Sequence, residues 1–201
     1  MEHNEIDAIK KEVKKEFELE RLKLFSDAVF AIVITMVAIE IKLPHFEEEV
    51  TEKLLKNTLL HLVPVIISYI VSFIFISVYW YAHFKLFSVL KTYDLGLVLR
   101  NLLLLFFIAL FPFGSTLFAE ALTIGNIPLI LYIIITFGCG FSGVILGRYI
   151  LSKPELLDEH ADITELTRQY LKMFDKETIK NHSPAGKLYK KWRDRKNVKK
   201  N

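Results

Sequence analysis

Residues 21–43 read Arg-Leu-Lys-Leu-Phe-Ser-Asp-Ala-Val-Phe-Ala-Ile-Val-Ile-Thr-Met-Val-Ala-Ile-Glu-Ile-Lys-Leu, and this stretch decides the fold. Only residues 28–39 are free of charge, which is shorter than the roughly 20 residues that cross a bilayer. A membrane helix here must therefore take Asp27, and in one alternative also Glu40, toward the membrane. Ionisable groups at that depth face protein or water and not lipid. The stretch predicts a polar helix at the centre of a helical bundle.

One face of this helix has the pattern of a pore lining. Ala28, Ile32, Thr35 and Ile39 recur at the spacing of a single helical face. Copied around a symmetry axis, they would form apolar rings with one hydroxyl ring between them, and a narrow apolar ring is a known kind of channel constriction. The alternative is that all four are ordinary packing residues. Pattern alone favours that alternative, because apolar faces are common in membrane helices.

The motif at the start of the helix is more specific. Arg21, followed by Phe25-Ser26-Asp27, Val29-Phe30-Ala31-Ile32 and Thr35, resembles the signature of the transmembrane protein 175 family of potassium channels. The resemblance implies a pore lined by this helix, with potassium as the permeant ion and no cofactor. It also implies that Ile32 forms the family's hydrophobic constriction and that Thr35 lies one turn further along.

The resemblance also bears on assembly. The Phe-Ser-Asp motif occurs once, and one helix cannot line a pore, so the chain must oligomerise. Family members with one repeat are tetramers, so the resemblance implies a tetramer here. A closed ring of four identical chains is also the simplest assembly. Family repeats usually carry six membrane helices, whereas four are predicted here.

Composition indicates a polytopic membrane protein. The 201 residues are 52% hydrophobic and 24% charged, and the charges lie at the ends and in the loops while long stretches carry none. The net charge of +3 predicts no nucleic-acid partner. Cys139 is the single cysteine, which excludes an intrachain disulfide, and we expect no metal site. No cleavable signal peptide is visible, so the first membrane helix would act as its own insertion signal.

We therefore predict an all-α integral membrane protein with three regions: a cytoplasmic amphipathic helix over residues 1–20, a channel domain over residues 21–151, and a charged cytoplasmic helical tail over residues 152–201. The predicted spans are residues 21–43, 58–82, 97–119 and 127–150. Residues 45–57 are predicted as a loop. Pro64 should lie near the start of its helix, and Pro112 with Gly114 should kink or end the third one.

The N-terminal region carries an apolar stripe among its Lys and Glu residues. Ile6, Ile9, Val13 and Phe17 recur at spacings of three and four. Such a stripe suits a helix that lies on the membrane or packs on a partner subunit. A solvated, charged extension of the first membrane helix is an equally good interpretation.

Polar residues of the later spans are candidates for packing contacts with the motif. Trp80 and His83 end the second span, and one of them is expected to hydrogen-bond the end of the first helix at Ser26 and Asp27. Arg100 would snorkel or pair with Asp27, and Asn101 is a candidate for a hydrogen bond between helices. We assign Arg21, Phe25, Ser26 and Asp27 to this packing network. A cation-attracting role for Asp27 at the pore entrance is the alternative.

Charge placement predicts the orientation. From Arg148 onward there are fourteen Lys and Arg residues, and the loop after the third span has none. Both termini are therefore predicted to be cytoplasmic, in a cell membrane that we expect to be prokaryotic. Residues 154–180 should form an amphipathic helix or two, and the basic residues 187–200 would contact anionic lipid headgroups.

Two other classes of function compete with a channel. A non-conducting scaffold would act through the charged tail. An enzyme needs a nucleophile with a base, or a metal site, and we expect none because the histidines are scattered through the chain. They are His3, His45, His61, His83, His160 and His182.

Overall fold

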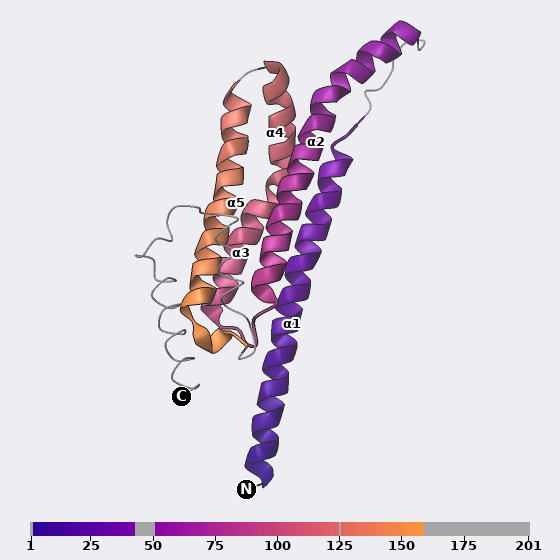
Figure 1. The fold of residues 1–201 in the computed structure, drawn as a ribbon. Helices are drawn as coiled ribbons and strands as arrows, with labels where there is room; N and C mark the ends of the chain where they lie inside the picture. Colours follow the sequence, from indigo (N-terminus) through magenta and orange to yellow (C-terminus); the bar gives the residue numbers. More distant parts are fainter. Residues whose placement is uncertain (1, 43–50, 125, 159–201) are drawn as a thin grey trace, which may run out of the picture. The chain divides into compact units, whose positions relative to one another are not determined.

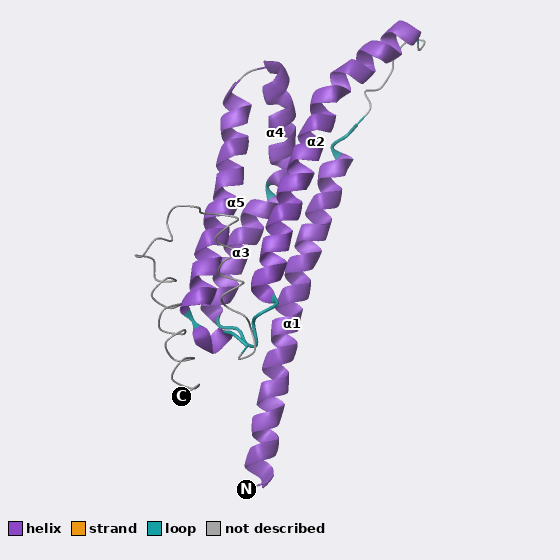
Figure 2. Ribbon diagram, viewed as in Figure 1, coloured by secondary structure: helices purple, strands orange, loops and turns teal. Residues whose placement is uncertain are grey.

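The computed structural model describes residues 2–42, 51–124 and 126–158, and Figure 1 follows their helices along the chain. The elements are α1 (Glu2–Ile39), α2 (Glu52–Phe87), α3 (Leu95–Ala109), α4 (Phe111–Ile124), α5 (Asn126–Ser152) and a 3₁₀ turn, η1 (Pro154–Leu156). In this part of the chain the only strand-like pairing is one isolated bridge, and Figure 2 shows helices joined by short loops. The all-α prediction is confirmed.

Four stretches of helix are long and apolar enough to cross a membrane. They are residues Ile9–Ile39, Thr58–Phe87, Leu95–Leu122 and Asn126–Ser152. Each contains an apolar stretch of 18 residues with at most two charged side chains, so the exposed side chains of that stretch are suited to lipid or to other helices. The predicted number of spans is confirmed.

The first two helices are longer than predicted. α1 is one continuous helix from Glu2, so the charged N-terminal segment extends the membrane helix. α2 begins at Glu52, and residues 52–57, which we predicted as loop, are helical. Pro64 consequently lies well inside α2 and not in its first turn. A proline can be tolerated there because neighbouring groups can satisfy the carbonyl that loses its partner.

The third span is interrupted near Pro112 and Gly114, as these two residues predicted. α3 ends at Ala109 and α4 begins at Phe111, so Pro112 occupies the first turn of the new helix, where its missing N–H is least costly. The Leu110 N–H donates to the Phe107 carbonyl at 3.2 Å, and the Gly114 N–H to the Leu110 carbonyl at 2.9 Å. These two bonds pair the Leu110 and Gly114 N–H groups across the break.

The chain divides into two compact units. One consists of Met1–Phe25, Tyr81–Leu102 and Gly140–Asn201, and the other of Ser26–Trp80 and Leu103–Cys139. We call them the motif-flanking unit and the pore-helix unit and describe each by itself.

Aromatic rings fill the interior of the pore-helix unit. The ring of Phe111 lies edge-on to Tyr132, with centroids 6.3 Å apart, and at a tilt to Tyr79 at 6.2 Å. Ile76 and Ile108 are also fully buried. Because lipid is as apolar as leucine, close packing holds such helices together in place of the hydrophobic effect.

The motif-flanking unit is closed by a short backbone pairing. Leu90, in the α2–α3 connection, forms an antiparallel bridge with Leu157, just after η1. The Lys91 N–H donates to the Leu156 carbonyl and the Asp158 N–H to the Val89 carbonyl, both at 2.9 Å. Of the amphipathic helix predicted over residues 154–180, residues 154–158 instead form the turn and this bridge. The rest, with the basic segment 187–200, lies outside the described residues.

Candidate pore face and helix-packing site

In the pore-helix unit, α1 has one buried face and one exposed face. Ser26, Phe30, Val33 and Val37 are at most 3% exposed and follow one another at spacings of four and three. The four candidate pore residues lie on the other face, where Ile32 is 57% and Ile39 is 65% exposed, and Ala28 and Thr35 are also exposed. The sequence therefore directs one face into the protomer and leaves the candidate pore face outside it.

Thr35 is the polar residue of the exposed face. Its hydroxyl donates to the carbonyl of Ile32, one turn back, at 2.7 Å. This bond uses the hydroxyl hydrogen, so the oxygen lone pairs remain as acceptors. The face consequently presents an oxygen acceptor between two isoleucines, which suits a cation better than an anion.

Asp27 of the motif is held by the second helix. Trp80 donates its Nε1–H to the Asp27 carboxylate at 3.0 Å, within the pore-helix unit. The hydrogen bond expected between α2 and the Ser26/Asp27 end of α1 is thus present, with Trp80 as the donor. It fixes one oxygen of a carboxylate that would otherwise be costly near the membrane.

His83 and Asn101 form a buried polar pair in the motif-flanking unit. His83 is 2% exposed, Asn101 is fully buried, and His83 Nε2 lies 2.9 Å from Asn101 Oδ1. The His83 ring also stacks on Phe87, with centroids 4.0 Å apart. This pair joins α2 to α3, as proposed for Asn101. Buried polar groups in a membrane protein need such partners because lipid supplies none.

Arg100 contacts an aromatic ring of α5. Its guanidinium lies 3.9 Å from the centroid of the Tyr149 ring and donates to the Gly96 carbonyl at 2.9 Å. A cation over a ring face is attracted by the ring quadrupole. The side chain is therefore satisfied inside the motif-flanking unit by an aromatic face and a backbone carbonyl.

The strongest polar cluster of this unit is centred on Asp94. Its Oδ1 accepts the Leu97 N–H at 2.7 Å, which caps the start of α3. Its Oδ2 accepts the Tyr149 hydroxyl at 2.6 Å and the Lys153 ammonium at 2.5 Å. Partial burial acts to raise the pKa of the Asp94 carboxyl, but the hydrogen bonds from Lys153, Tyr149 and the Leu97 N–H outweigh it and lower the pKa to about 2.

Gly96 makes room for this cluster. A Cβ at Gly96 would collide with the hydroxyl end of the Tyr149 side chain. Sequence reasoning missed the cluster, although part of the signal was present. An aspartate three residues before the first buried position of an apolar run is an N-cap signature, but its Tyr149 and Lys153 partners lie more than fifty residues away and leave no local pattern.

Small hydroxyls hold the pore-helix unit together. Ser68 Oγ lies 2.9 Å from Ser115 Oγ, and the same hydroxyl donates to the Ser115 carbonyl. Tyr79 donates its hydroxyl to the Thr136 carbonyl at 3.0 Å. These contacts join α2 to α4 and α5. Sequence reasoning missed them too, although serines among apolar residues of a membrane helix commonly form such bonds.

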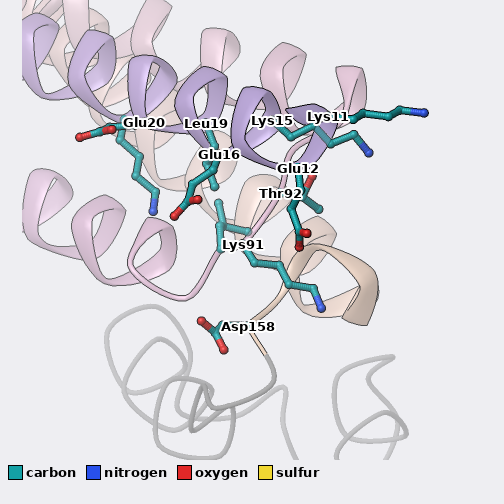
Figure 3. A pocket seen from close by; sticks show the side chains of 11 residues that line it. Lys11, Glu12, Lys15, Glu16, Leu19, Glu20, Lys91, Thr92 and Asp158 are labelled. Carbon is teal, nitrogen blue, oxygen red and sulfur yellow. The ribbon is translucent and has the colours of Figure 1, made fainter. Parts of the chain in front are cut away.

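A groove of about 950 Å³ lies beside the N-terminal part of α1, within the motif-flanking unit. Figure 3 shows side chains of α1 along one side of it and Lys91, Thr92 and Asp158 across from them. Its lining mixes lysines with carboxylates, so it has no charge preference strong enough to name a ligand. No group of three or more metal-ligating side chains occurs among the residues that the structure describes.

Comparison with known proteins agrees with the motif and the fold. The family described as "Endosomal/lysosomal potassium channel TMEM175" matches residues 21–112. A potassium channel of Chamaesiphon minutus is 37% identical over 112 residues, covering 55% of this chain and 54% of the relative. A potassium channel of a Chryseobacterium species is 35% identical over 95 residues, covering 47% and 46%. The chain thus spans about half the length of the curated relatives it matches.

A solved structure extends the similarity to the fold. The crystal structure of a lysosomal potassium-selective channel TMEM175 homolog from Chamaesiphon minutus superposes with a TM-score of 0.66 at 29% identity, covering 77% of this chain and 80% of that one. The expectation that the chain is not an enzyme is confirmed, because the matching family is one of ion channels. The motif, the four apolar spans and these similarities together indicate a multi-pass membrane protein that is similar to the TMEM175 family over residues 21–112 and shares the fold of a solved TMEM175 homolog.

Proposed function

We propose that this chain is the subunit of a homotetrameric channel that conducts potassium passively through a pore lined by α1. The observation that carries the proposal is the exposed face of α1, which each protomer leaves outside its own packing and which lies within the region matching the family. One helix cannot enclose a pore, so several copies must contribute this face. The bacterial relatives named potassium channels support potassium as the ion.

Ile32 would form the tightest ring, with Thr35 and Ile39 along the same face and Ala28 toward the motif. An apolar ring makes an ion shed water with little replacement. Potassium holds its hydration less tightly than sodium and therefore loses less in crossing. The Thr35 hydroxyl oxygen, whose hydrogen is engaged with the Ile32 carbonyl, would offer a partial substitute for the lost water one turn away.

Asp27 would have a structural role and not a role in conduction. Its bond to Trp80 ties the start of the pore-lining segment to α2. In the proposed orientation both termini are cytoplasmic and this end of α1 faces the cytoplasm of a prokaryotic cell. Asp27→Asn keeps an oxygen acceptor for Trp80, so we expect normal assembly; a lower conductance in an intact tetramer would instead assign Asp27 to the ion entrance.

Flux in liposomes tests the proposal. Purified protein should carry potassium faster than sodium, and Ile32→Asn should change that ratio by placing an amide in the constriction. Ile74→Asn on α2 is the matched control, since Ile74 is exposed to nearly the same extent, 56% against 57% for Ile32. The control should keep wild-type selectivity. A folded oligomer that carries no flux under any gradient would refute the channel and leave the scaffold function.

A further inference from the structure

An apolar stripe runs along the N-terminal half of α1, outside the candidate pore face. Its members, which we call the α1 stripe, are Ile6, Val13, Phe17 and Leu24, with exposed fractions of 43%, 58%, 59% and 61%. Ile9, which belongs to the stripe predicted from the sequence, is 60% exposed and lies beside this line on the side of Glu16 and Glu20. Their helix is otherwise rich in Lys and Glu at this end. Large apolar side chains gathered on one line of a charged helix mark an interaction surface.

The packed side of this half of α1 lies elsewhere. Within the motif-flanking unit, Leu19 is 3% exposed and Glu18 accepts the hydroxyl of Tyr93. Lys11 and Lys15 lie along the groove of Figure 3, on that same side. The α1 stripe points away from these residues by helical periodicity, so the protomer's own packing leaves it available.

The spacing of the stripe is that of a helical bundle. Ile6 and Phe17 are eleven residues apart, and so are Val13 and Leu24. An eleven-residue repeat covers three turns, so these side chains stay on one side of an almost straight helix that supercoils slightly to the right. In the sequence the same spacing continues beyond the stripe, through the residues of the candidate pore face: Ala28, Thr35 and Ile39.

The two flanks of the stripe carry opposite charge. By helical periodicity Lys10, Lys14 and Arg21 lie on one flank. Glu16 and Glu20 lie on the other flank, where they also border the groove, and all five side chains are exposed. In a parallel ring each copy turns its basic flank toward the acidic flank of the next. At a rise of about 1.5 Å per residue, Lys14 meets Glu16 and Arg21 meets Glu20 at nearly equal height.

This pattern argues against a helix that lies on lipid. Helices in the headgroup region are rich in Lys and Arg around their apolar face, and anionic lipid repels a flank of glutamates. A flank with Glu16 and Glu20 instead matches the basic flank of an identical chain.

We propose that the α1 stripe packs against the same stripe of other copies of this chain, forming a parallel helical bundle in which basic flanks contact acidic flanks. The inference rests on the proposed oligomer around α1 and adds a second contact surface outside the pore-lining segment. Such a bundle would hold the subunits in register independently of the pore residues.

Cysteine cross-linking of the full-length protein in liposomes tests the bundle. Cys139, which is buried, is first replaced by alanine. Single cysteines then replace Val13 or Phe17 in the stripe, or Lys11 or Lys15 on the groove side. Copper phenanthroline should cross-link the stripe variants to dimers several-fold more than the groove variants. Glu16→Lys should reduce cross-linking of the Val13→Cys variant. Adding Lys14→Glu to that double variant should restore cross-linking, because the two substitutions together exchange the charges of the two flanks.

The outcomes separate this inference from the channel proposal. Equal cross-linking at Val13 and Lys15, or none at either stripe position, in an oligomer that conducts potassium overturns the bundle alone. If mass photometry shows a monomer, the bundle and the oligomeric pore both fail. A bimane label at Val13 that is quenched by spin-labelled lipid and not by aqueous iodide overturns the bundle in favour of the membrane surface.

Discussion

Replacing Asp94 tests whether the cluster at the start of α3 stabilises the motif-flanking unit. Asp94→Ala removes the cap on the Leu97 N–H together with the acceptor for Tyr149 and Lys153. Asp94→Asn keeps an oxygen for the cap but loses the charge. The two variants therefore separate the cap from the ionic contacts.

The expected magnitudes follow from these contacts. A lost N-cap costs about 0.5–2 kcal/mol. A lost hydrogen bond to a charged group costs about 1.5–3 kcal/mol, and we take the lower half of that range because the Asp94 side chain is 31% exposed and screened by water. Asp94→Ala should then lower the free energy of unfolding by about 2–4 kcal/mol, and Asp94→Asn by about 1.5–2 kcal/mol, since asparagine caps as well as aspartate.

The dependence on pH has a defined sign. The folded pKa of Asp94 is about 2, below its ordinary value of 3.8, so the ionised contacts stabilise the fold above that ordinary value and are lost as the pH falls toward 2. The difference between wild type and Asp94→Asn should accordingly be the same at pH 5 and pH 8.

Unfolding by added dodecyl sulfate in mixed micelles, followed by circular dichroism, gives these free energies. Glu155→Gln is the matched control, because Glu155 also faces Lys153 but at 3.8 Å with a side chain 73% exposed. It should change little. An Asp94→Ala variant no less stable than this control, or an Asp94→Asn variant less stable than Asp94→Ala, would refute the reasoning.

Two further substitutions test the contacts of α2. Trp80→Phe removes the hydrogen-bond donor to Asp27, so the free energy of unfolding should fall by about 0.6–1.7 kcal/mol. Potassium flux in liposomes should be retained, and a loss of flux at unchanged stability would contradict the structural role. Asn101→Leu removes the side-chain partner of the buried His83 Nε2, so the free energy of unfolding in the same titration should fall by about 1–3 kcal/mol. His83→Ala and the double variant complete a double-mutant cycle, and a coupling energy of zero would show that the pair contributes nothing to stability.

Much of the fold could be predicted because long apolar segments leave few alternatives in a bilayer. Only a helix satisfies its own backbone there, so the number and type of the spans follow from hydropathy. The break of the third span followed from Pro112 and Gly114 for a local steric reason. The start of α2 could not be predicted in this way, because residues 52–57 are polar and nothing in their hydropathy distinguishes a helical extension from a loop.

Among the polar contacts, too, some could be predicted from local pattern and others could not. A hydrogen bond from Trp80 or His83 to the end of α1 at Ser26 and Asp27 was expected because these polar side chains lie near the same end of adjacent spans, and Trp80 and Asp27 form it. The cluster of Asp94, Tyr149 and Lys153 was missed because its members are distant in sequence and each has an ordinary interpretation alone. Tertiary geometry, not local pattern, decides which of many possible partners a polar side chain meets.

Exposure alone cannot separate a pore face from a lipid face. Ile32 and Ile74 are exposed to nearly the same extent in one protomer, yet only Ile32 is proposed to face ions. The difference lies in the neighbouring polar groups: Thr35 keeps hydroxyl lone pairs directed away from its own packing, while the hydroxyls of Ser68 and Tyr79 on α2 are engaged with α4 and α5. A hydroxyl left on an exposed apolar face gains nothing from lipid, so its position is explained when identical faces meet around a shared axis and enclose water and ions.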